Sequence, residues 1–305
     1  MKRIRSFINR NKKAIIKVLI IAILVILGIQ LLNYIVKIQN ETKLNENNTT
    51  TATKDYGQDQ EILGGETKTE KEYTTQKSIM QQFVDYCNNK DYENAYNLLT
   101  DECKTNIYPN LNMFKVNYCD IYFQTKKTCG FQLWRDNTYK IEIRDDLMTT
   151  GKYDENNYSQ DYYTINGQKL NIKGYIKKSK INKSNSKENV IIELNDIDYY
   201  IDYAEVNITV KNMTENTILL DNGEYNNDIV LINNKKAEYN SYVVEMAEDE
   251  LLVNRKETNQ LKIKMNLSYS DELKLEEMKF KGLILNYEEY KNLEKTDSIQ
   301  FTINM

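Results

Sequence analysis

Histidine is absent from this chain of 305 residues, and its absence removes several common kinds of catalytic site. A serine or cysteine nucleophile is usually activated by a neighbouring imidazole, and many zinc sites are built on histidine nitrogen. Neither arrangement is possible here. Carboxylate, tyrosine and lysine chemistry stays open, because it needs no imidazole.

Cysteine is scarce, and its spacing excludes two familiar motifs. No pair follows the C-x-x-C spacing of a thioredoxin-type site or a zinc knuckle. Four cysteines permit three disulfide pairings, and the alternative is that they pack as small buried hydrophobic residues. The second interpretation is favoured, since one of them follows a phenylalanine by four residues on an apolar helix face. The cysteines are Cys87, Cys103, Cys119 and Cys129.

Phosphate-binding loops are missing too. No G-x-G-x-x-G or Walker-type sequence occurs, and the only adjacent glycines are Gly64-Gly65, in a polar stretch. Two groups of acidic residues offer the oxygen ligands that calcium prefers, but neither has EF-hand spacing, and acidic residues in an acidic protein are usually solvated. These groups are Asp196, Asp198 and Asp202, and Asp221, Glu224 and Asp228.

Two pairs of adjacent acids and one run of tyrosines complete the candidates. Asp145-Asp146 and Glu288-Glu289 are not expected to form catalytic dyads, because neighbours on a strand point to opposite faces. Tyr199, Tyr200 and Tyr203 could form an interface patch, although a strand would bury half of them. The sequence therefore predicts no catalytic residue, no cofactor and no metal site.

One long apolar run stands out, from Val18 to Val36, and it carries no charge. A bilayer core needs about 20 apolar helical residues. Residues 1–17 hold seven bases and no acid, so the positive-inside rule predicts a transmembrane helix in contact with the lipid bilayer, a cytoplasmic basic tail and C-terminal domains outside. A cleaved signal peptide fits less well, because its apolar core is shorter. A buried core helix is the remaining alternative.

Charge and composition describe the remainder. From Val18 onward 34 bases stand against 45 acids, a balance that does not favour nucleic-acid binding. Residues 37–75 are polar and predict a flexible tether.

A helical apolar period follows the tether. Ile79, Phe83 and Cys87 lie on one stripe, and Asp91 and Thr100 are placed to cap two further helices. Pro109 ends the third helix, and a fourth is marked by Leu111, Phe114, Tyr118 and Tyr122.

After Phe123 the apolar period falls to two. Tyr139, Ile141 and Ile143 alternate with polar residues, and Asn166-Gly167 predicts a type I′ hairpin that sets Tyr163 opposite Leu170. Residues 76–176 are therefore expected to form an α+β domain.

This domain resembles a known family. Phe83-x-x-Tyr86, followed by Asp91-Tyr92-x-x-Ala95-Tyr96-x-Leu98-Leu99-Thr100 and then strands, is similar to the helical opening of the nuclear transport factor 2-like fold. The resemblance implies a curved sheet wrapped around helices into a cone. It also suggests membrane-anchored proteins of Gram-positive bacteria that serve conjugation or secretion channels. Some relatives are isomerases with a carboxylate and a tyrosine in the cone, but no such constellation is matched here.

The last part of the chain is expected to be all β. Residues 177–188 are polar and basic and predict a linker. From 189 to 305 the period is two, as in Val206, Ile208 and Val210, which predicts an immunoglobulin-like β-sandwich.

Two functions are compatible with this organisation. The first is an anchored binding or scaffold protein of the cell envelope, with an envelope protein or a second copy as partner. The second is a cone-pocket enzyme or small-ligand receptor that uses carboxylate and tyrosine groups. A deep polar pocket in residues 76–176 would favour the second, and an interior filled by aromatic residues would favour the first.

Overall fold

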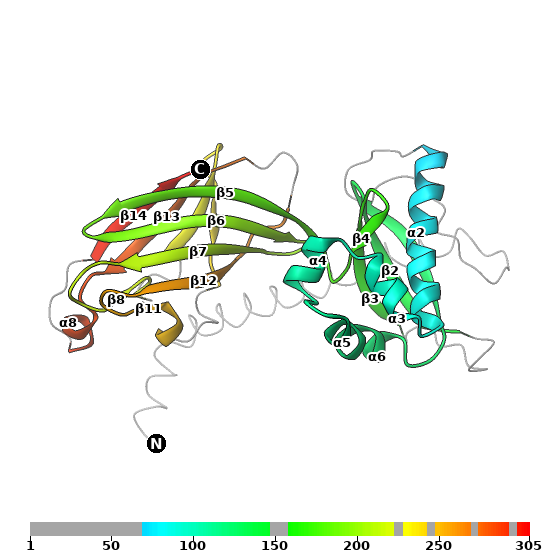
Figure 1. The fold of residues 1–305 in the computed structure, drawn as a ribbon. Coiled ribbons are helices and arrows are strands. Elements are labelled where there is room, and N and C mark those ends of the chain that lie inside the picture. The colour runs from blue at the N-terminus through cyan, green and yellow to red at the C-terminus, as the bar shows by residue number, and fades with distance from the viewer. Residues whose placement is uncertain (1–68, 147–157, 223–227, 243–247, 270–273, 293–297) are drawn as a thin grey trace, which may run out of the picture. The chain divides into compact units, whose positions relative to one another are not determined.

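A computed structural model describes residues 69–146, 158–222, 228–242, 248–269, 274–292 and 298–305 (Figure 1). The predicted transmembrane helix, residues 18–36, lies outside these ranges, as do the basic tail 1–17 and the tether up to residue 68. Among the described residues, no helix is both long enough and apolar enough to cross a membrane. The predicted fold class and single-pass localisation are therefore corrected to a sheet-rich fold, and the membrane assignment has no support from the structure.

The first described element is helix α2 (Glu70–Asn88), which begins earlier than its apolar stripe indicates. The Thr69 hydroxyl accepts the Glu72 N–H, and the Glu72 carboxylate accepts the Thr69 N–H, which is a capping box. Residues 69–75, predicted to end the tether, are therefore the cap and first turns of a helix. The buried face of α2 includes Phe83 and Cys87, as the period predicted.

The short helices follow the predicted caps. Asp91 caps α3 (Tyr92–Asn97) and Thr100 caps α4 (Asp101–Asn106), and both predictions are confirmed. The predicted fourth helix is divided by a turn of π-helix. Its parts are α5 (Leu111–Phe114), the π-helix η1 (Lys115–Cys119) and α6 (Asp120–Tyr122).

The first sheet is an antiparallel meander in the order β1-β2-β3-β4. Its apolar side chains form one core with the helices, and α2 packs against β1. The predicted inward residues Tyr139, Ile141 and Ile143 are all buried there. The strands are β1 (Lys127–Arg135), β2 (Thr138–Asp145), β3 (Ser159–Asn166) and β4 (Lys169–Asn171).

The β3–β4 hairpin has a different register from the predicted one. Ile165, and not Tyr163, lies opposite Leu170, and Asn166 pairs with Lys169. Gly167 adopts φ of 63° and begins the two-residue turn, while Asn166 stays in the strand. A turn with glycine at its first central position needs no positive φ at asparagine, so the asparagine does not fix the register.

The segment predicted to be a linker is a strand. β5 (Tyr175–Lys187) pairs with β6 (Val190–Tyr200) from Tyr175 opposite Tyr200 to Lys187 opposite Val190. Most side chains in its second half are exposed on both faces of the sheet, so this half lacks the apolar alternation that usually identifies a strand. The backbone hydrogen bonds to β6 stabilise it instead. All described residues belong to one compact unit, and the division into domains 76–176 and 189–305 stays a prediction.

Two sheets share the second core, which forms a β-sandwich (Figure 1). One has the order β12-β7-β6-β5, and the other β10-β9-β13-β8-β11 with β14 on β13. The consecutive strands β5, β6 and β7 are neighbours in one sheet, whereas an immunoglobulin sandwich separates its early strands between two sheets. The predicted immunoglobulin-like topology is therefore wrong.

The remaining elements all lie after β6. They are β7 (Ala204–Asn212), β8 (Ile218–Leu219), β9 (Ile229–Asn233), β10 (Glu238–Asn240), the short 3₁₀ helix η3 (Glu248–Leu251), β11 (Leu252–Val253), β12 (Thr258–Met265), β13 (Leu275–Ile284), α8 (Tyr287–Lys291) and β14 (Ser298–Asn304).

Candidate functional site

A carboxylate and two tyrosines meet inside the α+β part. Asp161 and Tyr163 lie two residues apart on β3, so both side chains point to the same face of the sheet. Tyr118 comes from η1, where the wider π turn interrupts the α-helical ladder. The three residues come from two segments more than 40 positions apart, and the fold brings them into contact.

The contacts form a chain of hydrogen bonds. The Tyr118 hydroxyl donates to Asp161 Oδ2 at 2.8 Å, and the two tyrosine hydroxyls lie 2.7 Å apart. Because the only hydroxyl hydrogen of Tyr118 is used in the hydrogen bond to the carboxylate, Tyr163 is the donor in the hydrogen bond between the two tyrosines. The Tyr162 N–H donates to Asp161 Oδ1 at 2.7 Å, so both carboxylate oxygens have partners.

Burial sets the protonation of this cluster. Desolvation raises the pKa of Asp161 to about 6, although hydrogen bonds from Tyr118 and the Tyr162 backbone and the charge of Lys173 oppose it. Burial also raises the pKa of Tyr118 and of Tyr163, and the Asp161 carboxylate adds to both shifts. A carboxyl that titrates near neutral pH beside a phenol could exchange protons with a ligand, if a ligand could reach it.

Lys173 and Tyr122 pack beside Tyr118 at one side of the cluster. The Lys173 ammonium donates to the Tyr122 hydroxyl at 2.5 Å and lies 4.2 Å from the centre of that ring. The Tyr122 ring is in turn 5.0 Å from the ring of Tyr118. A cation over an aromatic face is attracted by the electron-rich ring, so Lys173 holds Tyr122 in place.

Aromatic rings fill the space around the remaining sides. Phe114 stacks on Tyr118 at 5.7 Å, and Phe83 meets the edge of Tyr163 at 5.5 Å. Tyr118 and Tyr163 are fully buried, and Asp161 is 5% exposed. The acid and the tyrosines therefore converge, as a catalytic cone would require, but they do so inside packed protein and not at the wall of an open pocket.

A sequence signal for this cluster existed and was missed. The inward face of β3 runs through Asp161, Tyr163 and Ile165, and all three are buried. An acidic residue at an inward position of a period-two strand must be paired or protonated when it is buried. Asp161 could therefore have been identified as a buried acid, because the residues that follow it on the same face of the strand are apolar.

Asp196 and Asp198, the two acids on β6 that were considered as calcium ligands and not favoured, belong to a network of hydrogen bonds and ion pairs. Lys178 lies 3.2 Å from Asp196 and 3.4 Å from Asp198, and Asn207 donates to both carboxylates. The other oxygen of Asp198 accepts from Asn106 of α4 and from Tyr175. Burial lowers the pKa of Lys178, but the charges of Asp198 and Asp196 outweigh it and the pKa lies above its usual value.

The other acids that were considered as calcium ligands differ in burial. Asp202 is exposed in a turn, Asp221 and Asp228 are buried, and Glu224 lies outside the described residues. Within the described ranges, no three histidine, cysteine or acidic side chains gather as a metal-binding group.

The adjacent acid pairs differ from each other. Asp145 bonds Lys127 at 2.6 Å, whereas Asp146 lies 3.7 Å from Lys126, so the two carboxylates pair with different lysines. Glu288-Glu289 stand in the first turn of α8 and not on a strand, which corrects the assumed geometry.

The tyrosine run and the cysteines are mostly interior. Tyr199 and Tyr200 are both buried, in different cores, and the half-buried Tyr203 stacks on Tyr200 at 4.4 Å. The cysteines are free thiols, and three are fully buried, which confirms their interpretation as core residues. Cys129 is half-buried, and Cys87 and Cys119 lie 3.9 Å apart between sulfur atoms.

The surface of the same helices carries exposed apolar residues. Val116 is 49% exposed and Ile121 is 59% exposed, and both lie on the segment that contributes Tyr118. Leu111 and Met113, each 38% exposed, precede them on α5. Four of the six exposed large hydrophobic residues in the described ranges thus fall within Leu111–Ile121, the apolar segment. Concentrations of this kind often mark sites of protein contact.

Comparison with known proteins adds no family: no protein-family model, no curated protein and no solved structure matches the chain. The resemblance to the nuclear transport factor 2-like family therefore stays a prediction.

Proposed function

We propose that this protein acts by binding another protein, as an adaptor or scaffold, and that it does not catalyse a reaction. The observation that carries the proposal is the filled interior of the α+β part. Asp161 and Tyr118 are the groups that a cone-pocket enzyme would use, and Phe83, Phe114 and Tyr163 pack around them. A substrate would have to displace these rings, which contribute to the stability of the core.

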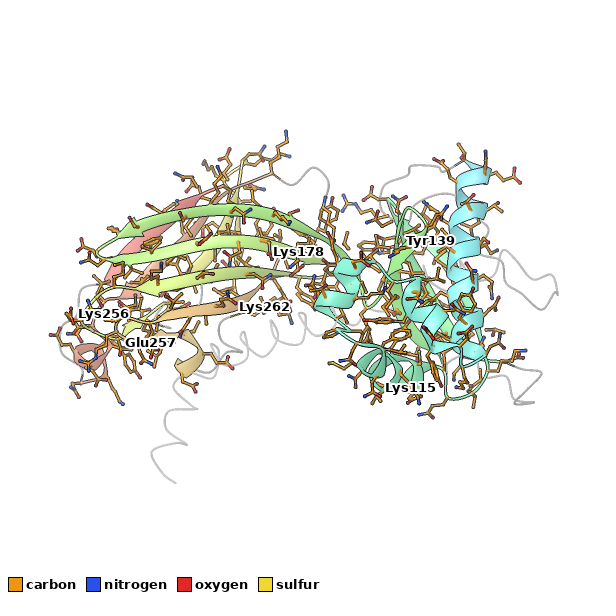
Figure 2. All side chains as sticks on the ribbon, in the orientation of Figure 1. Lys115, Tyr139, Lys178, Lys256, Glu257 and Lys262 are labelled. Atoms are coloured by element: carbon orange, nitrogen blue, oxygen red, sulfur yellow. The ribbon has the colours of Figure 1, made fainter. Side chains whose placement is uncertain are left out.

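The apolar segment, Leu111–Ile121, is the proposed contact surface. Its inward residues Phe114 and Tyr118 are fixed in the core, so its outward residues are held on a rigid base. Val116 and Ile121 would gain burial energy on contact with an apolar partner surface, about 25 cal/mol per Å² of apolar area. Lys115, exposed beside them, would add a polar contact at the rim (Figure 2).

The test uses a photo-activated cross-linking amino acid in cells. Introduced at Val116 or Ile121, it should trap the same partner protein. The matched control is Gln81, an exposed position on α2, where no cross-link to that partner is expected. The variant Val116→Glu/Ile121→Glu should lose the partner and keep the same unfolding midpoint. Absence of a cross-link at both positions would contradict the proposal.

A small-ligand or catalytic role is the second candidate, and one observation favours it. The pKa of Asp161 lies near 6, as suits a general acid or base at neutral pH. This role requires the aromatic filling to open. Binding or turnover of a small molecule that Asp161→Asn abolishes, with the fold retained, would support this candidate over the first.

A further inference from the structure

Two thiols meet in the core of the α+β part. Cys87 lies in the last turn of α2, and Cys119, 32 positions later, is the last residue of η1. Their sulfur atoms are 3.9 Å apart, and both residues are fully buried. In the described part of the chain, neither Cys103 nor Cys129 makes a contact of this kind with another thiol. One pair among the four cysteines is therefore distinguished by geometry.

The backbone around this pair is held on both sides. The side chain of Asn88, next to Cys87, donates to the Lys127 carbonyl and accepts from the Lys127 N–H, at 2.8 Å in each case. The Lys90 ammonium, just after α2, donates to the carbonyl of Phe123, which directly follows α6. The end of α2 is thus attached to β1 and to the segment that follows Cys119, so the contact between the thiols does not depend on the two sulfur atoms alone.

We infer that Cys87 and Cys119 form a modification site, a dithiol that reacts with small disulfides and closes into a disulfide between α2 and η1. The bond requires sulfur atoms about 2.05 Å apart, so each sulfur has to move by about 1 Å. Cys119 stands where the π-helical turn passes into the short helix α6. The wide turn interrupts the α-helical ladder there, which leaves this segment freer to adjust than the interior of α2.

The chemistry is thiol–disulfide exchange in two steps. The thiolate of one cysteine attacks the small disulfide, forms a mixed disulfide and releases one small thiolate. The thiolate of the second cysteine then attacks the protein sulfur of the mixed disulfide, and a second small thiolate leaves. The two electrons reduce the small disulfide, and the two protons of the cysteine thiols end on the two small thiols that it yields.

Burial sets the rate of this exchange. Desolvation raises the pKa of Cys87 well above its usual value, and the contact with Cys119 raises it further. Since only the thiolate attacks, the closed core protects both sulfur atoms. The reaction therefore proceeds through local opening of the short helical segments α5, η1 and α6, and reclosing returns the two sulfur atoms to contact. Exchange should be slow in the native chain and faster at higher pH or in dilute urea.

The disulfide changes the stability of this part of the chain. It joins residues 32 positions apart and so restricts the unfolded chain more than a short loop would. We expect the midpoint of thermal unfolding to rise by roughly 5–10 °C in the oxidised chain. The inference stands on the contact between the thiols and does not depend on the binding role proposed for the apolar segment.

Counting free thiols tests the site. The folded full chain is incubated with oxidised glutathione, its remaining thiols are blocked with a maleimide in denaturant, and intact mass spectrometry counts them. Two blocked thiols and a peptide map that joins Cys87 to Cys119 are expected. The matched controls Cys103→Ala and Cys129→Ala should form the same bond, whereas Cys87→Ala and Cys119→Ala should form no disulfide within the protein. A bond that involves Cys103 or Cys129 in the folded parent chain would overturn the inference.

A second measurement removes the question of access. The chain is unfolded in urea and refolded in the presence of oxidised and reduced glutathione, so that all four thiols can react before the core closes. The refolded product should carry the disulfide between Cys87 and Cys119 and should lose its added thermal stability on reduction. A refolded product that keeps four free thiols would overturn the inference. The photo-cross-links at Val116 and Ile121 measure a different property, so either proposal can fail while the other holds.

Discussion

The hydroxyl of Tyr118 lies 2.8 Å from Asp161 Oδ2, and this hydrogen bond joins the π-helix η1 to strand β3. The Tyr118 hydroxyl thus donates a hydrogen bond to one carboxylate oxygen and accepts a hydrogen bond from Tyr163. Because these groups are buried, their pairing matters for stability whether or not a ligand ever reaches them.

The pH dependence of stability should reveal Asp161. In the unfolded chain an aspartate has a pKa of about 3.9, whereas burial raises the pKa of Asp161 to about 6. Its contribution to stability is complete below the unfolded pKa and is lost as the pH rises through the folded pKa. The free energy of unfolding, relative to that of Asp161→Asn, should fall by about 2–3 kcal/mol between about pH 4 and pH 7.

Urea unfolding at several pH values measures this difference. The control Asp202→Asn removes a carboxylate from an exposed turn. A constant difference between the parent chain and Asp161→Asn over that pH range would show that Asp161 is not desolvated in the folded protein.

Loss of the Tyr118 hydroxyl should be costly. Tyr118→Phe leaves Asp161 Oδ2 and the Tyr163 hydroxyl without this partner, and we expect a loss of about 1–3 kcal/mol in the free energy of unfolding. The pKa of Asp161 should rise further, because the hydrogen bond that lowers it is gone. Tyr163→Phe keeps the donor to Asp161 and is the comparison. Equal pH profiles for the two variants would contradict the assigned direction of the bonds.

Lys178 should contribute more to the free energy of unfolding than a surface lysine does. Lys178→Met leaves the fully buried Asp198 without its cation, and we expect a loss of about 3 kcal/mol. Lys178→Met/Asp198→Asn should recover part of it. Lys256→Met, which breaks an exposed pair with Glu215, should change the free energy of unfolding much less (Figure 2). Similar losses for the two single variants would show that Asp198 is more solvated than its burial indicates.

The hairpin turn gives a backbone test. Gly167→Ala should destabilise by about 1 kcal/mol, because φ of 63° is unfavourable for a residue with Cβ. No atom lies within 4 Å of the added Cβ, so the loss reports conformation alone. Gly167→Asn should lose less, since asparagine tolerates this region. Thermal unfolding of the two variants measures the difference, and an alanine variant as stable as the parent would exclude this turn geometry.

The features that could be predicted from the sequence are those that depend on residues close together in the chain. The caps Asp91 and Thr100 and the inward stripe with Phe83 are decided by neighbours in the chain, so pattern and structure agree. Alternation on β2 and β7 was readable for the same reason. The α2 start was also present as Thr69-x-x-Glu72, but the polar composition of the preceding residues concealed it.

Long-range partners were not readable. β5 looks like a linker because its stability comes from the ladder with β6 and not from apolar side chains. The position of Asp161 on β3 marks it as a buried acid, but nothing local identifies its partner Tyr118, which lies 43 positions earlier in the chain. The Gly167 turn shows a third limit, since two turn types fit the same residues and differ in which pairs face each other.

The strand β5 has a consequence for how this protein could have arisen. Its first residue, Tyr175, belongs to the core of the helices and first sheet, and the next residue, Ile176, belongs to the core of the sandwich. Adjacent residues of one strand thus complete two interiors. A recombination breakpoint between residues 175 and 187 would cut a strand that is paired along its length. The parts of the chain before and after this strand would therefore be exchanged together and not as independent domains.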